Sequence, residues 1–182
     1  MEKILIKEFL KDKNVGAVVS SSKNVVKKIT NEIDFEKADV IVEYGPGKGI
    51  ITKQLLKNMK VGASLYVFET NQDFINDLNN INDKRLIIIN TDAKSALSIL
   101  KSRYKIENVD YVISTIPFTF LDRRLKRRII FNSHTMLKEK GKFITYQYTP
   151  LIYSIIKNKF TNFSITPNVS NFPFAFVMKG VK

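Results

Sequence analysis

Short apolar runs alternate along this chain with segments whose apolar residues recur every three to four positions. The runs are five to seven residues long and nearly continuous in aliphatic and aromatic residues, which is typical of buried parallel strands. They predict strands at 39–43, 65–69, 85–89, 109–113 and 142–148. The intervening segments predict helices at 49–59, 72–80, 94–102 and 121–138. This alternation indicates a parallel sheet covered by helices on both faces.

The two ends of the chain depart from the alternation. Before the first strand, the pattern predicts helices over 1–11 and roughly 22–33, with serines 20–22 capping the second. After Pro150 it predicts one more helix and two strands near 160–166 and 174–180, which would form an antiparallel hairpin at the sheet edge. The expected fold class is therefore α/β, with a doubly wound, mostly parallel seven-stranded sheet and N-terminal helices. No linker or repeat interrupts the pattern, so we expect a single domain over 1–182, with a helical lid at 1–35 and a core at 36–182.

Composition narrows the class of protein. The absence of cysteine excludes disulfides and thiolate chemistry, and the single histidine, His134, excludes a multi-histidine metal site, so no metal is expected. Lysine and arginine number 30 against 17 acidic residues, a net charge of +13. Such an excess predicts a polyanionic partner, either nucleic acid or an anionic membrane surface. The N-terminus does not resemble a signal peptide, and no apolar run reaches the roughly 20 residues of a spanning helix. We therefore expect a cytoplasmic protein whose membrane contact is peripheral.

The first strand-to-helix turn carries a glycine motif. Gly45, Gly47 and Gly49 follow the spacing G-x-G-x-G, which lets the backbone turn sharply and a ligand approach closely. Glu43 precedes the motif, where it would repel a pyrophosphate but attract a cation. The dinucleotide fingerprint requires its third glycine one residue later, and the P-loop pattern is absent.

Two further carboxylates follow predicted strands. Glu69 ends the second strand, twenty residues beyond Gly49, where it can accept both hydroxyls of a ribose. Asp92 follows the third strand and can either accept from an adenine amino group or cap the next helix. Together with Glu43, these acids suit a positively charged adenosine ligand.

In this order and spacing, the chain resembles the class I S-adenosylmethionine-dependent methyltransferases, which have a Rossmann-like core, over nearly its whole length. The resemblance implies S-adenosyl-L-methionine as cofactor and S-adenosyl-L-homocysteine as product. Glu43 and the glycines would hold the methionine part, Glu69 the ribose, and Asp92 with Ala93 the adenine. The cofactor-binding residues that it implies are Glu43, Gly45, Gly47, Gly49, Glu69, Asp92, Ala93 and Ser114.

The acceptor loop of such enzymes follows the fourth strand and here reads Ser114-Thr-Ile-Pro-Phe118. Enzymes that methylate adenine N6 carry Asn, Asp or Ser where this chain has Thr115, because the weakly basic amine must donate to a side-chain oxygen. The ribosomal RNA adenine dimethylases also append a C-terminal helical domain, which this sequence does not show. Ribosomal RNA adenine N6-methylation is therefore the alternative function.

A second resemblance fits more of the sequence. Segments 9–22, 114–118, 143–150 and 171–175 are similar to motifs of the soluble bacterial phospholipid N-methyltransferases, although Phe174 replaces a proline of the last motif. This resemblance implies methylation of the amine of phosphatidylethanolamine toward phosphatidylcholine, by a monomer without an obligate protein partner. An ornithine lipid is a further amine acceptor left open.

Amine methylation requires a neutral nitrogen. An alkylamine with a pKa near ~10.4 costs about 4–5 kcal/mol to deprotonate at pH 7, and desolvation between aromatic walls lowers that cost. We expect Tyr148 to take the proton, assisted by Thr115, in a pocket lined by Ile116, Pro117, Phe118 and Tyr146. Both tyrosines could instead serve only in strand packing.

The positive charge is concentrated in two places. Five basic residues lie within 123–128, and at helical spacing Arg123, Arg124, Arg127 and Arg128 share one face. We expect this face to bind lipid phosphate, with Arg123 and Arg127 contacting the substrate. Arginine clusters bind RNA phosphate equally well, and a merely solvated face is a third interpretation. Segment 1–11 is expected to form an amphipathic lid that closes over the cofactor and touches the membrane, or else a helix packed on the domain.

Overall fold

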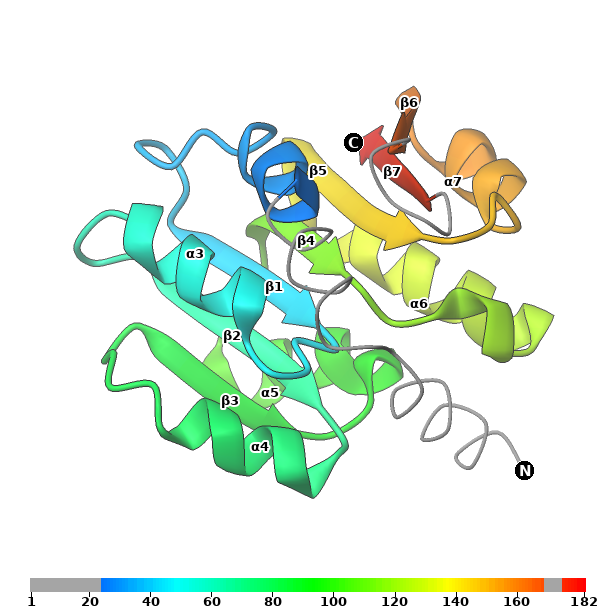
Figure 1. Ribbon diagram of the computed structural model, residues 1–182. Coiled ribbons are helices and arrows are strands. Elements are labelled where there is room, and N and C mark those ends of the chain that lie inside the picture. The colour runs from blue at the N-terminus through cyan, green and yellow to red at the C-terminus, as the bar shows by residue number, and fades with distance from the viewer. Residues whose placement is uncertain (1–23, 169–174) are drawn as a thin grey trace.

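The computed structural model describes residues 24–168 and 175–182, which form one seven-stranded sheet covered by helices (Figure 1). The strands are β1 (Val40–Tyr44), β2 (Ser64–Glu69), β3 (Leu86–Asn90), β4 (Val109–Ser114), β5 (Leu137–Gln147), β6 (Asn162–Asn168) and β7 (Ala175–Val181). The helices are residues 24–30, α3 (Ile50–Asn58), α4 (Gln72–Asn79), α5 (Ala96–Tyr104), α6 (Arg123–Met136) and α7 (Tyr153–Lys159). The predicted helix over 1–11 lies outside the described residues.

The sheet has the order β3-β2-β1-β4-β5-β7-β6. Strands β1 to β5 pair in parallel, whereas β7 runs antiparallel to both β5 and β6. The predicted α/β fold class, with its parallel sheet and antiparallel C-terminal hairpin, is therefore confirmed. Because the parallel strands share one direction, their carboxyl ends meet along one edge, where ligands of open α/β sheets bind.

Each face of the sheet is buried by its own set of helices. Alternate residues of β1 point to opposite faces, so that Val42 packs with α5, α6 and α7, while Ile41 packs with residues 24–33, α3 and α4. The central strands β1, β2 and β4 are thus buried on both sides. This explains why they appear in the sequence as continuous apolar runs rather than as alternating ones.

Side-chain caps set several helix starts. Asn71 accepts from the backbone N–H of Asp73 and opens α4 as predicted. Helix α6 begins at Arg123 rather than at 121, because Asp122 accepts from the backbone N–H of Leu125 and acts as its N-cap. In the part of the chain that is described, no helix combines the length and the apolar character needed to cross a bilayer.

Strand β5 begins five residues earlier than predicted. The pairing of β4 with β5 shifts from Val109↔Leu137 to Tyr111↔Lys142, so residues 138–141 bulge out of the ladder. Lys140 there adopts a left-handed backbone with φ of 64°. A polar segment with such an irregularity carries no strand periodicity, which is why the pattern continues helix α6 to 138 instead of ending it at Met136.

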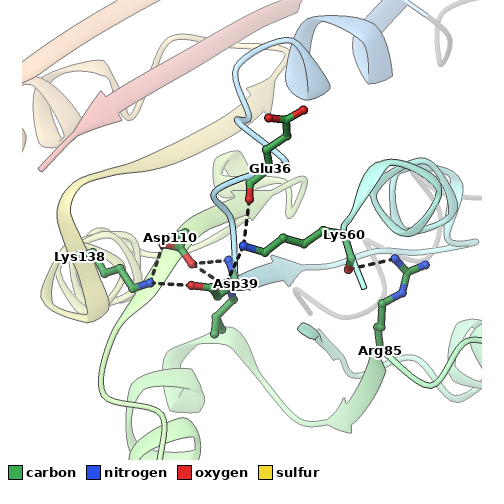
Figure 2. Close-up of polar contacts among 7 residues, drawn as sticks. Glu36, Asp39, Lys60, Arg85, Asp110 and Lys138 are labelled. Carbon is green, nitrogen blue, oxygen red and sulfur yellow. Dashed lines mark hydrogen bonds and ion pairs between the residues drawn. The ribbon is translucent and has the colours of Figure 1, made fainter. Parts of the chain in front are cut away.

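A polar network ties the strands together at the amino edge of the sheet, opposite the candidate site (Figure 2). One oxygen of Asp110 accepts from the backbone N–H groups of Asp39 and Val40 at 2.9 Å each, and the other pairs with Lys138 at 2.8 Å. Lys60 pairs with Asp39 at 2.8 Å and holds the pKa of that carboxyl below its ordinary value. The network therefore fastens β1, β4 and β5 to one another.

Replacing Asp110 by alanine is expected to lower the free energy of unfolding by about 2–3 kcal/mol, because two backbone donors and one ammonium lose their acceptor. Urea denaturation measures the change. The control is Asp77→Ala on the exposed face of α4, which should change stability by less than about 0.5 kcal/mol. Equal stability of the two variants would show that the network contributes nothing.

Candidate active site

The carboxyl edge of the sheet brings together most residues singled out in the sequence. Tyr44 at the end of β1 pairs with Ser114 of β4, which in turn pairs with Thr145 of β5. Glu69 ends the neighbouring strand β2. The loops that leave these ends, the glycine loop at 45–49 and the acceptor loop at 114–122, therefore lie against each other.

Two glycines of the glycine loop have different surroundings. Gly45 and Gly47 both have a left-handed backbone, with φ of 66° and 55°. A Cβ atom on Gly45 would lie 2.6 Å from the side chain of Ile116, so this glycine permits the contact with the acceptor loop. Among the residues that the structure describes, none lies within 4 Å of a Cβ atom placed on Gly47. Within this part of the chain the backbone at Gly47 therefore has room for a ligand, and ligand binding there stays a prediction.

Glu69 holds the glycine loop in place. Its carboxylate accepts from the backbone N–H of Gly47 at 3.2 Å and from those of Thr70 and Asn71 at 2.8 and 2.9 Å. The side chain is 8% exposed. Oε1 uses both of its lone pairs on Thr70 and Asn71, whereas Oε2 accepts only from Gly47 among the described residues and keeps one lone pair for a ligand. This placement is compatible with acceptance from ribose hydroxyls, which stays a prediction.

Glu43 is a fully buried carboxyl with only one of its oxygens satisfied. Oε2 accepts from the hydroxyl of Thr52 at 2.7 Å, while Oε1 has no hydrogen-bond partner among the described residues. Burial raises the pKa of Glu43 to about 7. An unsatisfied buried carboxyl oxygen next to a ligand-binding loop fits an N–H-bearing cationic ligand. The hydroxyl of Ser114 is likewise buried without a partner in the described chain. The residues present therefore fit S-adenosylmethionine.

The raised pKa of Glu43 predicts a pH-dependent stability of the ligand-free protein. Between pH 4.5 and about 7, the folded chain keeps a proton on this carboxyl that the unfolded chain releases. The free energy of unfolding should therefore fall as pH rises through that window, by up to about 3 kcal/mol from this group. In the Glu43→Gln variant, the free energy of unfolding should fall by up to about 3 kcal/mol less than in wild type over this pH range. The control Glu107→Gln changes an exposed residue and should show the wild-type pH dependence. Denaturant titrations at pH 5 and pH 8 measure the change in the free energy of unfolding. An equal change in wild type and both variants would contradict the prediction.

Gln147 is a site residue that the sequence interpretation missed. Its amide oxygen accepts from the backbone N–H of Phe118 at 3.1 Å, and its amide nitrogen donates to the carbonyl of Ile116 at 2.9 Å and to the hydroxyl of Thr145 at 3.0 Å. The side chain is 3% exposed. Gln147 therefore fixes the acceptor loop on both sides of Pro117. The signal available in the sequence was a lone amide at the carboxyl end of β5, after the apolar pair Phe143 and Ile144.

The acceptor loop is also fastened to the glycine loop. The hydroxyl of Thr115 donates to the carbonyl of Gly45 at 2.7 Å, and its backbone N–H donates to the carbonyl of Tyr44 at 3.1 Å. The hydroxyl proton of Thr115 is thus used in a hydrogen bond within the chain. The lone pairs of the same oxygen can accept a hydrogen bond from the amine to be methylated. Phe118, expected as a pocket wall, is only 1% exposed and packs into the core with Ile129 and Ile130.

The remaining predicted residues lie around this centre. Tyr146 and Tyr148 are half-buried at the end of β5, and their rings meet edge to face with centroids 5.4 Å apart. Asp92 caps the turn after β3, because its carboxylate accepts from the backbone N–H of Lys94 at 2.8 Å, and Ala93 beside it is buried. The capping interpretation of Asp92 is thus observed, and contact with adenine stays a prediction. Arg123 and Arg127 are exposed on α6.

Comparison of the sequence with known proteins identifies the family and two relatives. Residues 9–140 match the family model of the ribosomal RNA adenine dimethylases. A probable ribosomal RNA small subunit methyltransferase A of Methanococcus aeolicus is 28% identical over 88% of this chain, and the match covers 63% of that protein. An ornithine lipid N-methyltransferase of Singulisphaera acidiphila is 25% identical, over 92% of this chain and 90% of that protein. This chain thus spans less than two thirds of the ribosomal relative but nearly the whole lipid relative.

Solved structures share the fold at low sequence identity. The N-methyltransferase NodS from Bradyrhizobium japonicum superposes with a TM-score of 0.71 at 13% identity, over 90% of this chain and 97% of that one. A methyltransferase from Archaeoglobus fulgidus described as dependent on S-adenosylmethionine gives 0.67 at 13% identity, over 88% and 94% of the two chains. The architecture of the described residues is therefore that of these enzymes.

Proposed function

This chain belongs to the ribosomal RNA adenine dimethylase family of S-adenosylmethionine-dependent methyltransferases, and we propose that it methylates the primary amine of a membrane lipid headgroup. Phosphatidylethanolamine and an ornithine lipid both present such an amine. The enzyme would act as a peripheral protein at an anionic membrane surface. The cofactor supplies an electrophilic methyl group when it is bound.

The observation that supports this proposal most directly is the hydrogen bond made by the hydroxyl of Thr115. At the position where adenine N6-methyltransferases place Asn, Asp or Ser, this chain places a hydroxyl whose proton is already donated to the carbonyl of Gly45. A hydroxyl oxygen accepts from a tetrahedral amine in many directions, but it lacks the planar geometry of an amide beside a flat base. Compared with Asn or Asp, Thr115 thus suits an alkylamine better than an adenine, although a serine there would present the same hydroxyl.

The lipid relative supports the same choice. The match with the ornithine lipid N-methyltransferase extends over 90% of that protein. The sequence also carries four segments similar to phospholipid N-methyltransferase motifs, two of which include the acceptor loop and the end of β5. The proposal therefore rests on the acceptor side of the site as well as on overall similarity.

The residues of the chain have distinct tasks in this proposal. Glu43 and Glu69 hold the cofactor, and the hydrogen bonds of Gln147 and Thr115 hold the acceptor loop at the same edge of the sheet. The ammonium must lose a proton to solvent before its nitrogen can attack, and Tyr148 is the residue we assign to accept a hydrogen bond from the neutral amine. Holding the two reactants in line supplies most of the acceleration.

Ribosomal RNA adenine methylation is the second candidate function, favoured by the family match over residues 9–140. The experiment incubates the protein with methyl-labelled S-adenosylmethionine and, separately, phosphatidylethanolamine vesicles, ornithine lipid vesicles, and small-subunit ribosomal RNA. We expect label in one of the lipid fractions. Label in RNA alone would overturn the proposal and establish the second function. Label in none of the three would refute both.

A further inference from the structure

Exposed apolar side chains gather on two neighbouring helices. The large hydrophobic residues with more than a third of their surface exposed, among those described, are Ile50, Val61, Phe131, Leu151 and Tyr153. Phe131 belongs to α6, Tyr153 begins α7, and Leu151 lies in the turn just before α7. Phe131 is 47% exposed, Leu151 57% and Tyr153 36%. Isolated exposed apolar residues are ordinary, but a group on one face indicates an interaction surface.

Several contacts join the elements that carry these residues to one another and to the acceptor loop. Helices α6 and α7 pack together in the same core (Figure 1). The ammonium of Lys159 in α7 lies 4.7 Å from the ring centroid of Phe131 in α6. The hydroxyls of Thr119 and Thr149 are 3.2 Å apart, which joins the acceptor loop to the turn that precedes Leu151. The surface thus adjoins the place where an acceptor would enter.

Cations without a carboxylate partner among the described residues lie close to Phe131 and Tyr153. Phe131 lies one helical turn beyond Arg127 and Arg128 and therefore shares their stripe on α6. Lys157 lies 5.7 Å from the ring centroid of Tyr153. None of these cations, nor Arg123 or Arg124, has a carboxylate within ion-pair distance in the described part of the chain, although Lys60, Arg85, Lys138, Lys142 and Lys179 do.

We propose that this α6–α7 face, formed by Phe131, Leu151, Tyr153 and the surrounding arginines and lysines, docks on an anionic lipid bilayer. The inference deepens the proposed function, on which it rests, because it names the surface that brings the acceptor loop to its substrate. Aliphatic and aromatic side chains ringed by cations match the boundary between headgroups and acyl chains. An RNA backbone would satisfy the cations but would leave the aliphatic Leu151 without a role.

The test measures sedimentation with vesicles of phosphatidylcholine containing phosphatidylglycerol, and with vesicles of phosphatidylcholine alone. Leu151→Ser should lower partitioning onto the anionic vesicles about fivefold. Its matched control is Val61→Ser, since Val61 is 97% exposed in the turn between α3 and β2 and should bind as wild type. The double variant Arg124→Glu with Arg128→Glu should lower binding to the anionic vesicles at least tenfold. Its control is Lys57→Glu with Lys84→Glu, which reverses two exposed lysines elsewhere and should lower that binding less.

Two outcomes would overturn this inference. One is vesicle binding that Leu151→Ser and the arginine reversals leave unchanged. The other is binding of ribosomal RNA that the arginine reversals abolish and Leu151→Ser leaves intact, which would make the face an RNA surface. Circular dichroism of every variant confirms folding. Methyl transfer to lipid dispersed in neutral detergent micelles separates the docking proposal from the proposed function. Transfer of the labelled methyl group in micelles requires catalysis but no binding to an anionic bilayer.

Discussion

Replacing Glu69 by alanine is expected to weaken binding of S-adenosylmethionine at least a hundredfold. The carboxylate orders the glycine loop through the backbone N–H of Gly47 and is expected to accept from both ribose hydroxyls. Hydrogen bonds to a charged group contribute about 1.5–3 kcal/mol each, and about 1.4 kcal/mol is tenfold in affinity, so the loss of two exceeds a hundredfold. Isothermal titration calorimetry measures the change directly.

An analogue that lacks the ribose 2′-hydroxyl separates the ribose contact from the ordering of the loop. Wild type should bind it more weakly than the parent ligand, whereas Glu69→Ala should bind the two with similar affinity, because the acceptor is gone. Asp77→Ala, on the exposed face of α4, is the control and should bind as wild type. Unchanged affinity in Glu69→Ala would show that the ribose assignment is wrong.

Replacing Gln147 by leucine is expected to lower kcat for methyl transfer about a hundredfold, with a far smaller change in cofactor affinity. The side chain is of similar size, but the backbone N–H of Phe118 and the carbonyl of Ile116 lose their buried partners, so the acceptor loop shifts. A displacement of about 1 Å in an active site commonly costs a factor of about 10² in rate. Gln147 is thus a positioning residue, and steady-state kinetics with separate titration of the cofactor tests it.

A second variant distinguishes positioning from general destabilisation. Gln147→Glu keeps an acceptor for Phe118 but loses the donor to Ile116 while the carboxyl is ionised. Its activity relative to wild type should therefore rise as pH falls and the buried carboxyl gains a proton. Gln72→Leu, an exposed glutamine on α4, is the matched control. A flat ratio of the two activities across pH would contradict this role.

Local pattern predicted most of the fold, because the strands are buried on both faces and the helices carry recognisable starts. Asn71 illustrates this, since one side chain both ends the loop after β2 and caps α4. The early start of β5 was not predictable in the same way. Its first residues pair with β4 across a polar bulge at 138–141, and only the tertiary register reveals that pairing.

The proximity of the candidate cofactor residues to one another could be predicted for a related reason. Glu43, the glycines and Glu69 lie at strand ends, so their spacing along the chain translates directly into proximity at one sheet edge. Gln147 acts on residues 29 and 31 positions away, and Thr52 on a glutamate nine positions away. These contacts depend on which strand lies beside which and on how a loop folds back, information that no local motif contains.

The acceptor loop and the arginine stripe of α6 occupy one uninterrupted stretch of chain, from Ser114 to Arg128. The polar network of Figure 2 that joins β1, β4 and β5 lies at the opposite edge of the sheet and draws on no residue of this stretch. Substitutions at exposed positions of this stretch could therefore change the choice of nucleophile while leaving that network intact. Phe118 is the exception, since its side chain is buried in the core.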